Sequence, residues 1–285
     1  MAIGFALCCF GFTAVNDLVF RLYARKSRSR GAYVMVIGVV WALLFTLLLD
    51  CKFTNLTVTL VWGSISGIFS AVANILLIEA MTYQESGICS TLYRLNMAIV
   101  AVGAFLLLGE PINGLKIIGI ILALVAVCFF YRESRNGKSK VHDAAHIGIY
   151  LALGAALLRA AMGLSYKYAF IQHADRNGLI TLNSFFWIVV GLAYMLCRER
   201  SLKFMEAKSI RYGIVSGLLV GGIIYFMALA LQYGDASVVL PVAQMSFLGT
   251  CVLGVFFLRE SMTVGKLIGI SAGITSIIAL ILGSG

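Results

Sequence analysis

The sequence predicts an all-α membrane protein with ten transmembrane helices arranged as two inverted five-helix repeats. Three observations support this fold class: an apolar composition, ten long apolar segments and an internal duplication. Of 285 residues, 61% are hydrophobic and only 12% are charged, and the mean hydropathy is +0.99. A soluble domain has about a quarter of its residues charged, so this chain cannot cover itself with polar surface. Apolar runs of about 18 or more residues, without strand alternation, indicate membrane-spanning helices.

The apolar segments divide the chain into ten spans joined by short connections. We expect them at residues 2–20, 33–49, 58–82, 87–108, 115–131, 146–171, 178–197, 210–233, 236–258 and 264–283. Residues 1–132 form the first repeat, residues 133–145 a basic linker loop, and residues 146–285 the second repeat. Because no connection is long enough for a soluble domain, we expect any function to lie within the bilayer.

The second half of the chain repeats the first at a constant offset of 150. Residues 213–282 match residues 63–132 without a gap; Tyr83 recurs as Tyr233, Glu110 as Glu260, and the block 116–120 as 266–270. Internal repeats of this kind are evidence for duplicated architecture. Each half carries an odd number of spans, so the second enters the membrane from the opposite side. Inverted repeats in secondary transporters place the substrate site near the midplane, between the halves.

Small residues at four-residue spacing predict close helix packing. Gly213, Gly217 and Gly221 form one ridge, Gly265, Gly269 and Gly273 form another, and Gly63 and Gly67 form a shorter one. Small residues on one face let helix backbones approach closely in lipid, so we assign these glycines to packing alone. The only proline within a span is Pro241, which we expect to kink the ninth span.

Basic residues predict the orientation. They gather in the loops after spans 1, 5 and 7, at Arg21, Arg25, Lys26, Arg28, Arg30, Arg132, Arg135, Lys138, Lys140, Arg198, Arg200, Lys203, Lys208 and Arg211. Basic loops remain cytoplasmic, so both termini are predicted to be external, in a plasma (inner) membrane. The net charge of +10 is therefore interpreted as setting topology and not as a nucleic-acid surface.

The sequence offers little to a metal, a cofactor or ATP. The seven cysteines show no paired spacing and mostly lie inside apolar runs, where they are expected as small core residues. His142, His146 and His173 lie near span ends and form no HExxH motif. No glycine-rich phosphate-binding loop is present. We expect no metal, no cofactor and no ATP-driven pumping.

Several segments resemble the EamA-type module of the drug/metabolite transporter superfamily. They are residues 79–83, 87–95, 107–110 and 116–119, and again residues 228–233, 236–237, 258–260 and 267–269. The resemblance implies a ten-helix fold of two inverted repeats that carries small metabolites. Members often have a proline in spans 4 and 9, in the part facing the pathway; this chain has Arg94-Leu95-Asn96 and Gln244-Met245-Ser246 there. We interpret Glu110 and Glu260, the most recognisable acids of the family, as charges at helix N-termini and not as catalysts.

Charged side chains inside spans need an explanation, because each costs about 2.5–3.5 kcal/mol at a helix centre. Glu79 and Arg94 lie at similar depth on either side of the turn near Ser86, so an ion pair between them is available. Such a pair could merely neutralise itself, or it could line the pathway and open for a charged substrate. Arg94 aligns with Gln244 at the repeat offset, and we expect these two to face each other across the axis.

Arg159 lies deepest in the bilayer and has no acid near it in sequence. Asp17, Glu79 or a substrate must therefore compensate its charge, since a guanidinium cannot deprotonate. We predict that Arg159 binds an anionic substrate group. For Asp17 the default interpretation is a helix-end pair with Arg21.

The remaining candidates for substrate binding are uncharged. Asn74, Asn183 and Gln244 are polar residues within spans, for which interhelical hydrogen bonds are the alternative explanation. Tyr93 could stack on a ligand or serve as an interfacial anchor.

These features favour a secondary transporter over an enzyme. The expected substrate is a small polar metabolite, anionic or zwitterionic, such as an amino acid or an organic or phospho-anion. A coupling proton or a counter-substrate is a possible partner, and the expected assembly is a monomer or homodimer. One alternative is a flippase for lipid headgroups. An intramembrane enzyme is disfavoured, because it would need a nucleophile and base within the spans.

Overall fold

The protein is described here by a computed structural model that covers residues 1–24, 29–51, 55–84, 86–136, 145–199, 207–258 and 262–283. Within these ranges the secondary structure is helical. Ten segments are long and apolar enough to cross a membrane, and they coincide with the ten predicted spans to within a few residues. The chain is thus a multi-pass membrane protein. Part of the predicted linker, residues 137–144, lies outside the described residues.

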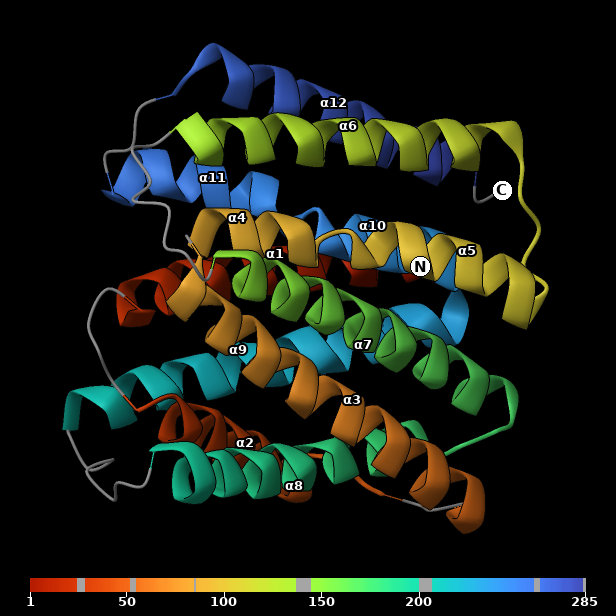
Figure 1. Cartoon of the computed structure of the whole chain (residues 1–285). Coiled ribbons are helices and arrows are strands. Elements are labelled where there is room, and N and C mark those ends of the chain that lie inside the picture. Colours follow the sequence, from red (N-terminus) through yellow and green to blue (C-terminus); the bar gives the residue numbers. More distant parts are fainter. Residues whose placement is uncertain are drawn as a thin grey trace.

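Eight of the spans are single helices, and two are split. The first repeat contains α1 (Ala2–Ala24), α2 (Arg30–Leu48), α3 (Leu56–Tyr83), α4 (Ser86–Tyr93), α5 (Asn96–Leu108) and α6 (Gly114–Asn136). The second contains α7 (Ala145–Ile171), α8 (Arg176–Tyr194) followed by the π-helical turn η1 (Met195–Glu199), α9 (Ala207–Tyr233), α10 (Ala236–Gln244), α11 (Ser246–Leu258) and α12 (Val264–Leu282). Figure 1 shows these helices running roughly side by side across the molecule.

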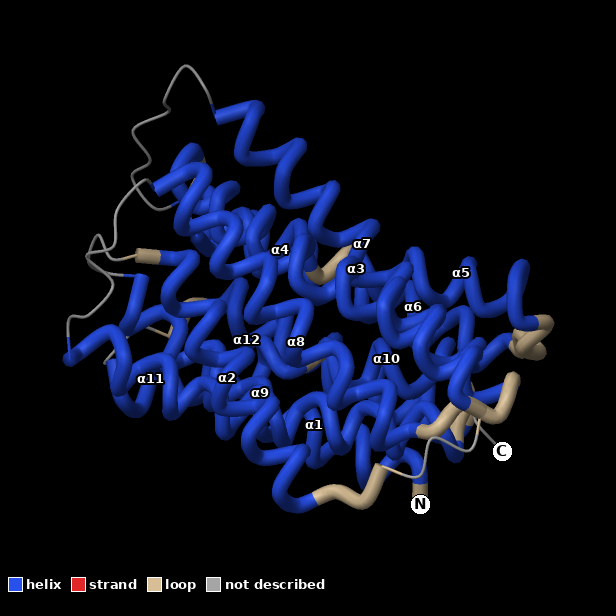
Figure 2. Tube along the Cα trace, turned by 90° about the horizontal axis from the view of Figure 1, so that it is seen from below, coloured by secondary structure: helices blue, strands red, loops and turns tan. Residues whose placement is uncertain are grey.

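The bundle has two chemically different ends. At the first end α1 and η1 finish and α2, α7 and α9 begin, next to the basic loops; we call this the basic end. At the other end lie the first residue of α1 and the last of α12, and we call this the termini end. Figure 2 shows both chain termini at that end.

The predicted glycine ridges are packing surfaces, and they pack in the same way in both repeats. A side chain on Gly213 or Gly217 of α9 would collide with a valine of α2, and one on Gly63 or Gly67 of α3 would collide with a side chain of α8. The side chains that fill these positions are Val36, Val40, Leu182 and Phe186. Such repeated contacts are what two copies of one unit related by an inverted twofold axis require.

Spans 4 and 9 are interrupted at equivalent positions, which the continuous apolar runs did not predict. The Leu95 N–H bonds to the carbonyl of Leu92, three residues back, and the equivalent Met245 N–H is shared between the carbonyls of Pro241 at 3.1 Å and Val242 at 3.3 Å. These residues correspond at the offset of 150. Pro241 lies inside α10, shortly before the second break, and it supplies no N–H to the helix. At the first break the Asn96 side chain donates to the carbonyl of Tyr93 at 2.6 Å.

The two broken spans pack together at the termini end but not at the basic end. Every residue of α10 is buried, and α10 packs against α5, α6 and α7. At the offset of 150, α10 corresponds to α4, and its partners α5, α6 and α7 correspond to α11, α12 and α1. At the basic end, α4 makes at most marginal contact with these three helices. The contact of α10 with α5, α6 and α7 at the termini end therefore has no close counterpart for α4 at the basic end, among the described helices.

Candidate functional site

Arg94 lies where the two broken spans meet. It is the first residue after α4 and is only 7% exposed. Its guanidinium donates to Gln244 Oε1 at 2.9 Å and to Asp17 Oδ2 at 2.5 Å. Since Gln244 ends α10, one side chain joins both repeats, and the prediction that Arg94 and Gln244 face each other is confirmed.

Asp17 also belongs to this site, although the sequence led us to expect a helix-end pair with Arg21. Its carboxylate pairs with Arg94 and accepts from Thr250 Oγ1 at 3.3 Å; the Arg21 side chain lies outside the described residues. Asp17 follows the lipid-exposed Val15 by two residues, about 200° around the helix at 3.6 residues per turn. It thus points into the bundle, yet its side chain is 30% exposed.

Arg159 lies on α7, the counterpart of α1, although the offset of 150 aligns it with Cys9 and aligns Asp17 with Lys167. It follows the lipid-exposed Leu157 by two residues, so it also points about 200° away from lipid, and it is partly exposed. Its guanidinium contacts the Met162 sulfur at 3.4 Å. No acidic side chain within the described ranges pairs with it.

Polar atoms without a protein partner accompany the two breaks. Arg94 Nε and Ser246 Oγ are buried and make no hydrogen bond within the described structure. Buried polar groups are nearly always paired, so unpaired ones need an explanation. Here they flank the junction of the repeats, where a polar ligand could supply the missing partners.

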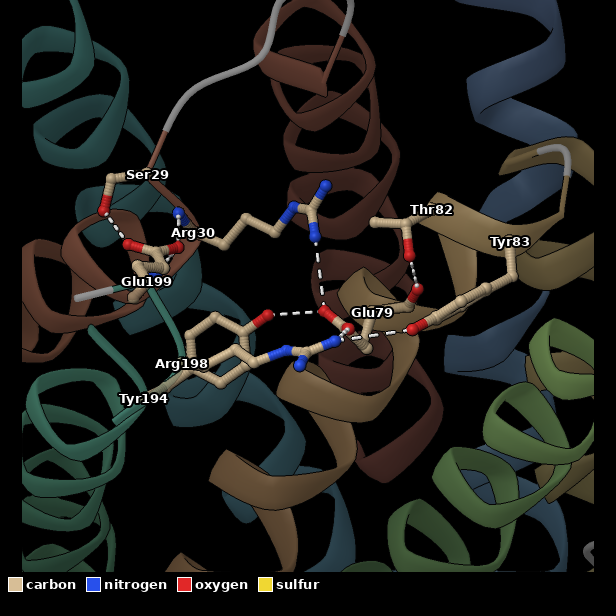
Figure 3. Close-up of polar contacts among 9 residues, drawn as sticks. Ser29, Arg30, Glu79, Thr82, Tyr83, Tyr194, Arg198 and Glu199 are labelled. Carbon is tan, nitrogen blue, oxygen red and sulfur yellow. Dashed lines mark hydrogen bonds and ion pairs between the residues drawn. The ribbon is translucent and has the colours of Figure 1, made fainter. Parts of the chain in front are cut away.

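The Glu79–Arg94 ion pair is not formed, because each residue has other partners. Glu79 receives Arg30 and Arg198 at 3.2 Å each and the Tyr194 hydroxyl at 2.5 Å. Figure 3 shows this group at the basic end, with side chains from α2, α3, α8 and η1 converging on one carboxylate. Arg94 turns instead toward α1. The two residues are similar in depth but face different neighbours, which span depth alone cannot reveal.

The π-helical turn η1 also fixes the start of α2. Glu199 accepts from Ser29 Oγ and from the backbone N–H groups of Arg30 and Gly31, at 2.5, 2.7 and 3.1 Å. These N–H groups have no partner inside the helix, and a carboxylate is favoured there by the helix dipole. Glu199 and the Glu79 group together bind α2, α3 and α8 at the basic end (Figure 3).

Other predicted site residues hold the helices in place. Asn183 is fully buried, donates to Gly63 O, Ser66 Oγ and Leu179 O, and accepts from the Tyr166 hydroxyl. It is an interhelical tether of α3, α7 and α8.

Asn74 and Tyr93 make only local contacts. Asn74 donates to the Ser70 carbonyl of its own helix. Tyr93 ends α4 with a buried side chain, next to Arg94, and its carbonyl accepts from Asn96.

The contacts of Glu110 confirm that it acts as a charge at a helix N-terminus. Its carboxylate accepts from the backbone N–H groups of Ala236 and Ser237, at 2.7 and 2.9 Å. The helix that it caps is α10, in the other repeat. Glu260, for which the same role is predicted, lies outside the described residues.

Comparisons with known proteins agree with this architecture. The sequence profile of the EamA-like transporter family matches residues 1–132 and 146–282. An uncharacterized protein of Methanocaldococcus jannaschii, MJ1333.1, is 32% identical over 104 residues, which are 34% of this chain and 74% of that protein. One solved crystal structure of a protein is similar over 99% of this chain and 97% of the chain in that structure. Its TM-score is 0.81 at 11% identity, which shows a shared fold.

Proposed function

Because the chain belongs to the EamA-like transporter family, we propose that it is a secondary transporter that moves a small anionic or zwitterionic metabolite by alternating access. Family membership supports a membrane transporter of small molecules and not an enzyme. The observation behind the finer proposal is Arg159, which faces the interior of the bundle, is partly exposed and has no acidic partner among the described residues.

The balance of charge between the repeats defines the substrate class. Arg94 and Asp17 neutralise each other. Arg159 cannot lose its proton, so it leaves one positive charge inside the bilayer. Intramembrane charges are paired or functional. A carboxylate or phosphate of the substrate would compensate Arg159, while an ammonium group, if present, would find the exposed part of Asp17.

The unequal packing of the broken spans supports alternating access. The contact of α10 with α5, α6 and α7 at the termini end, without a matching contact of α4 with α11, α12 and α1 among the described residues, is the asymmetry expected of one state of a rocking mechanism. Under the positive-inside rule the basic end faces the cytoplasm, and both termini are external. In the present state the pathway would then open toward the cytoplasm.

Uptake into proteoliposomes tests the proposal. Purified protein would be assayed with a panel of radiolabelled amino acids, organic anions and phosphorylated metabolites, with a pH gradient in one arm and internal counter-substrate in another. We expect Arg159→Gln to lower uptake of the substrate at least tenfold, since a hydrogen bond to a charged group is worth about 1.5–3 kcal/mol. The matched control is Arg198→Gln, an exposed arginine at the basic end, which should keep most of the activity.

Two results would contradict this assignment. Unchanged flux in Arg159→Gln removes Arg159 from the binding site. If instead no metabolite moves but a headgroup-labelled lipid crosses the bilayer in a manner that depends on Arg159, the cargo is a lipid headgroup and the protein is a flippase.

A further inference from the structure

The N-terminus of α10 is held by side chains of the opposite repeat. Glu110 follows the left-handed Gly109 at the end of α5, and it is only 7% exposed. Both of its carboxylate oxygens accept, one from the N–H of Ala236 and one from that of Ser237. Charge-assisted bonds of this kind are about twice as strong as neutral ones, and the helix dipole adds to them.

A second contact holds the same point. The Lys116 ammonium is almost fully buried, and it donates to Asp235 Oδ2 at 2.7 Å and to the Pro111 carbonyl at 2.9 Å. Asp235 is the N-cap residue of α10, yet its side chain makes no capping bond. Aspartate is among the best capping residues. Here it binds Lys116 instead, and Glu110 takes its place at the helix end.

The same residue types recur at the offset of 150. Glu110 corresponds to Glu260, Lys116 to Lys266, and Asp235 to Glu85; Glu85 and Glu260 lie outside the described residues. Among the described helices, α4 makes at most marginal contact with α11, α12 and α1. Where the repeats are packed, at the termini end, the first set is joined.

We propose that Glu110, Lys116 and Asp235 form a state-dependent latch, which holds the termini end closed and must open for the pathway to face that side. This inference rests on the proposed transport function. The three residues are positioning residues, because they touch the start of α10 and not the substrate. Opening the termini end separates α10 from α5 and α6, which breaks all of these contacts.

The test measures conformation without substrate, so its failure is distinct from a failure of the transport assay. In a cysteine-replaced background, Ser237→Cys reports on the termini end, where Ser237 is buried, and Ser90→Cys reports on the partly exposed α4. Each is labelled with a hydrophilic maleimide in detergent. We expect Glu110→Gln to raise the labelling rate at position 237 roughly tenfold, or about 1.4 kcal/mol, and to lower the rate at position 90.

Opposite changes at the two reporters identify a shift between states. If the labelling rate rises at both positions, Glu110→Gln has loosened the packing as a whole. If neither rate changes, the Glu110 contact does not control the termini end. Either result overturns the proposal. Asp235→Asn is the second variant: asparagine caps a helix as well as aspartate does, but it lacks the charge that Lys116 binds. It should shift both rates in the same directions. Glu260→Gln is the matched control and should not raise the rate at position 237.

Discussion

At the scale of single residues, the repeat made one pairing predictable and left others hidden. Arg94 and Gln244 could be placed face to face because they occupy equivalent positions about the axis. The partner Asp17 has no such relation to Arg94, from which it is separated by 77 residues. Glu79 likewise binds Arg30 and Arg198, which are 49 and 119 residues away. A long side chain reaches several helices, and only the packing decides which of them it contacts.

Replacing Asp17 tests the neutral pair. Asp17→Asn leaves the Arg94 charge without a counter-charge, so we expect a loss of stability. The loss should be smaller than the roughly 3–5 kcal/mol of a fully buried pair, because Asp17 is 30% exposed. Added anionic metabolites should then stabilise the variant more than the wild type, since Arg94 is free to bind them. Thermal unfolding with and without the anions measures both effects.

The control for this variant is Thr250→Val, which removes the hydroxyl bond to Asp17 but no charge. It should cost only about 1 kcal/mol and create no new response to anions. Equal losses in the two variants, with no added response in Asp17→Asn, would mean that the ion pair contributes nothing beyond a hydrogen bond.

At the scale of elements, hydropathy located the spans but not their interruptions. Each broken span is apolar apart from a few residues, such as Arg94 and Asn96 in span 4 and Gln244 in span 9, and average hydropathy does not show where its helix breaks. Pro241 indicated a kink in span 9. Span 4 contains no proline and breaks at the same place. There the Asn96 side chain and the two bonds of Arg94 replace helical contacts, and these depend on neighbours that sequence alone does not reveal.

The crossing of α2 and α8 offers a test of close helix packing. An added methyl on Gly191 would lie 2.6 Å from the backbone nitrogen of Met35, which cannot move without its helix. Gly191→Ala should therefore lower the free energy of unfolding by about 1–3 kcal/mol, as overpacking commonly does. Thermal unfolding of purified protein measures it.

The control is Gly11→Ala in α1, where no atom lies within 4 Å of the new methyl. Alanine is preferred over glycine inside helices, so this variant should be neutral or slightly more stable. A loss at Gly11 as large as that at Gly191 would show that the α2–α8 contact is not limiting.

At the scale of the whole molecule, an odd number of spans in each repeat was enough to predict the inverted architecture. The state of the molecule was not predictable, because two equivalent repeats encode both ends with the same residue types. Only the three-dimensional packing shows that α10 contacts α5, α6 and α7 while α4 makes at most marginal contact with α11, α12 and α1. The choice between the two states depends on small differences between similar contacts at the two ends.

Orientation is tested on the two ends of one helix. Ile112 lies just before α6 at the termini end, and Arg132 lies near its other end; both are exposed. In cells expressing a cysteine-replaced protein, an impermeant maleimide should label Ile112→Cys from outside, and should label Arg132→Cys only after permeabilisation. The reverse labelling pattern would show that the orientation is inverted and that the basic end faces outward.

The ion pair of Asp17 with Arg94 also sets a condition on biosynthesis. Asp17 enters the bilayer in the first span, 77 residues before its counter-charge has been made. Asp17 lies three residues before the end of that span, and a charged side chain within a span adds to the cost of insertion, by less than the helix-centre value. Insertion therefore costs less if the first helix stays beside the translocon until the fourth helix emerges, because the two helices then enter the lipid as a neutral pair.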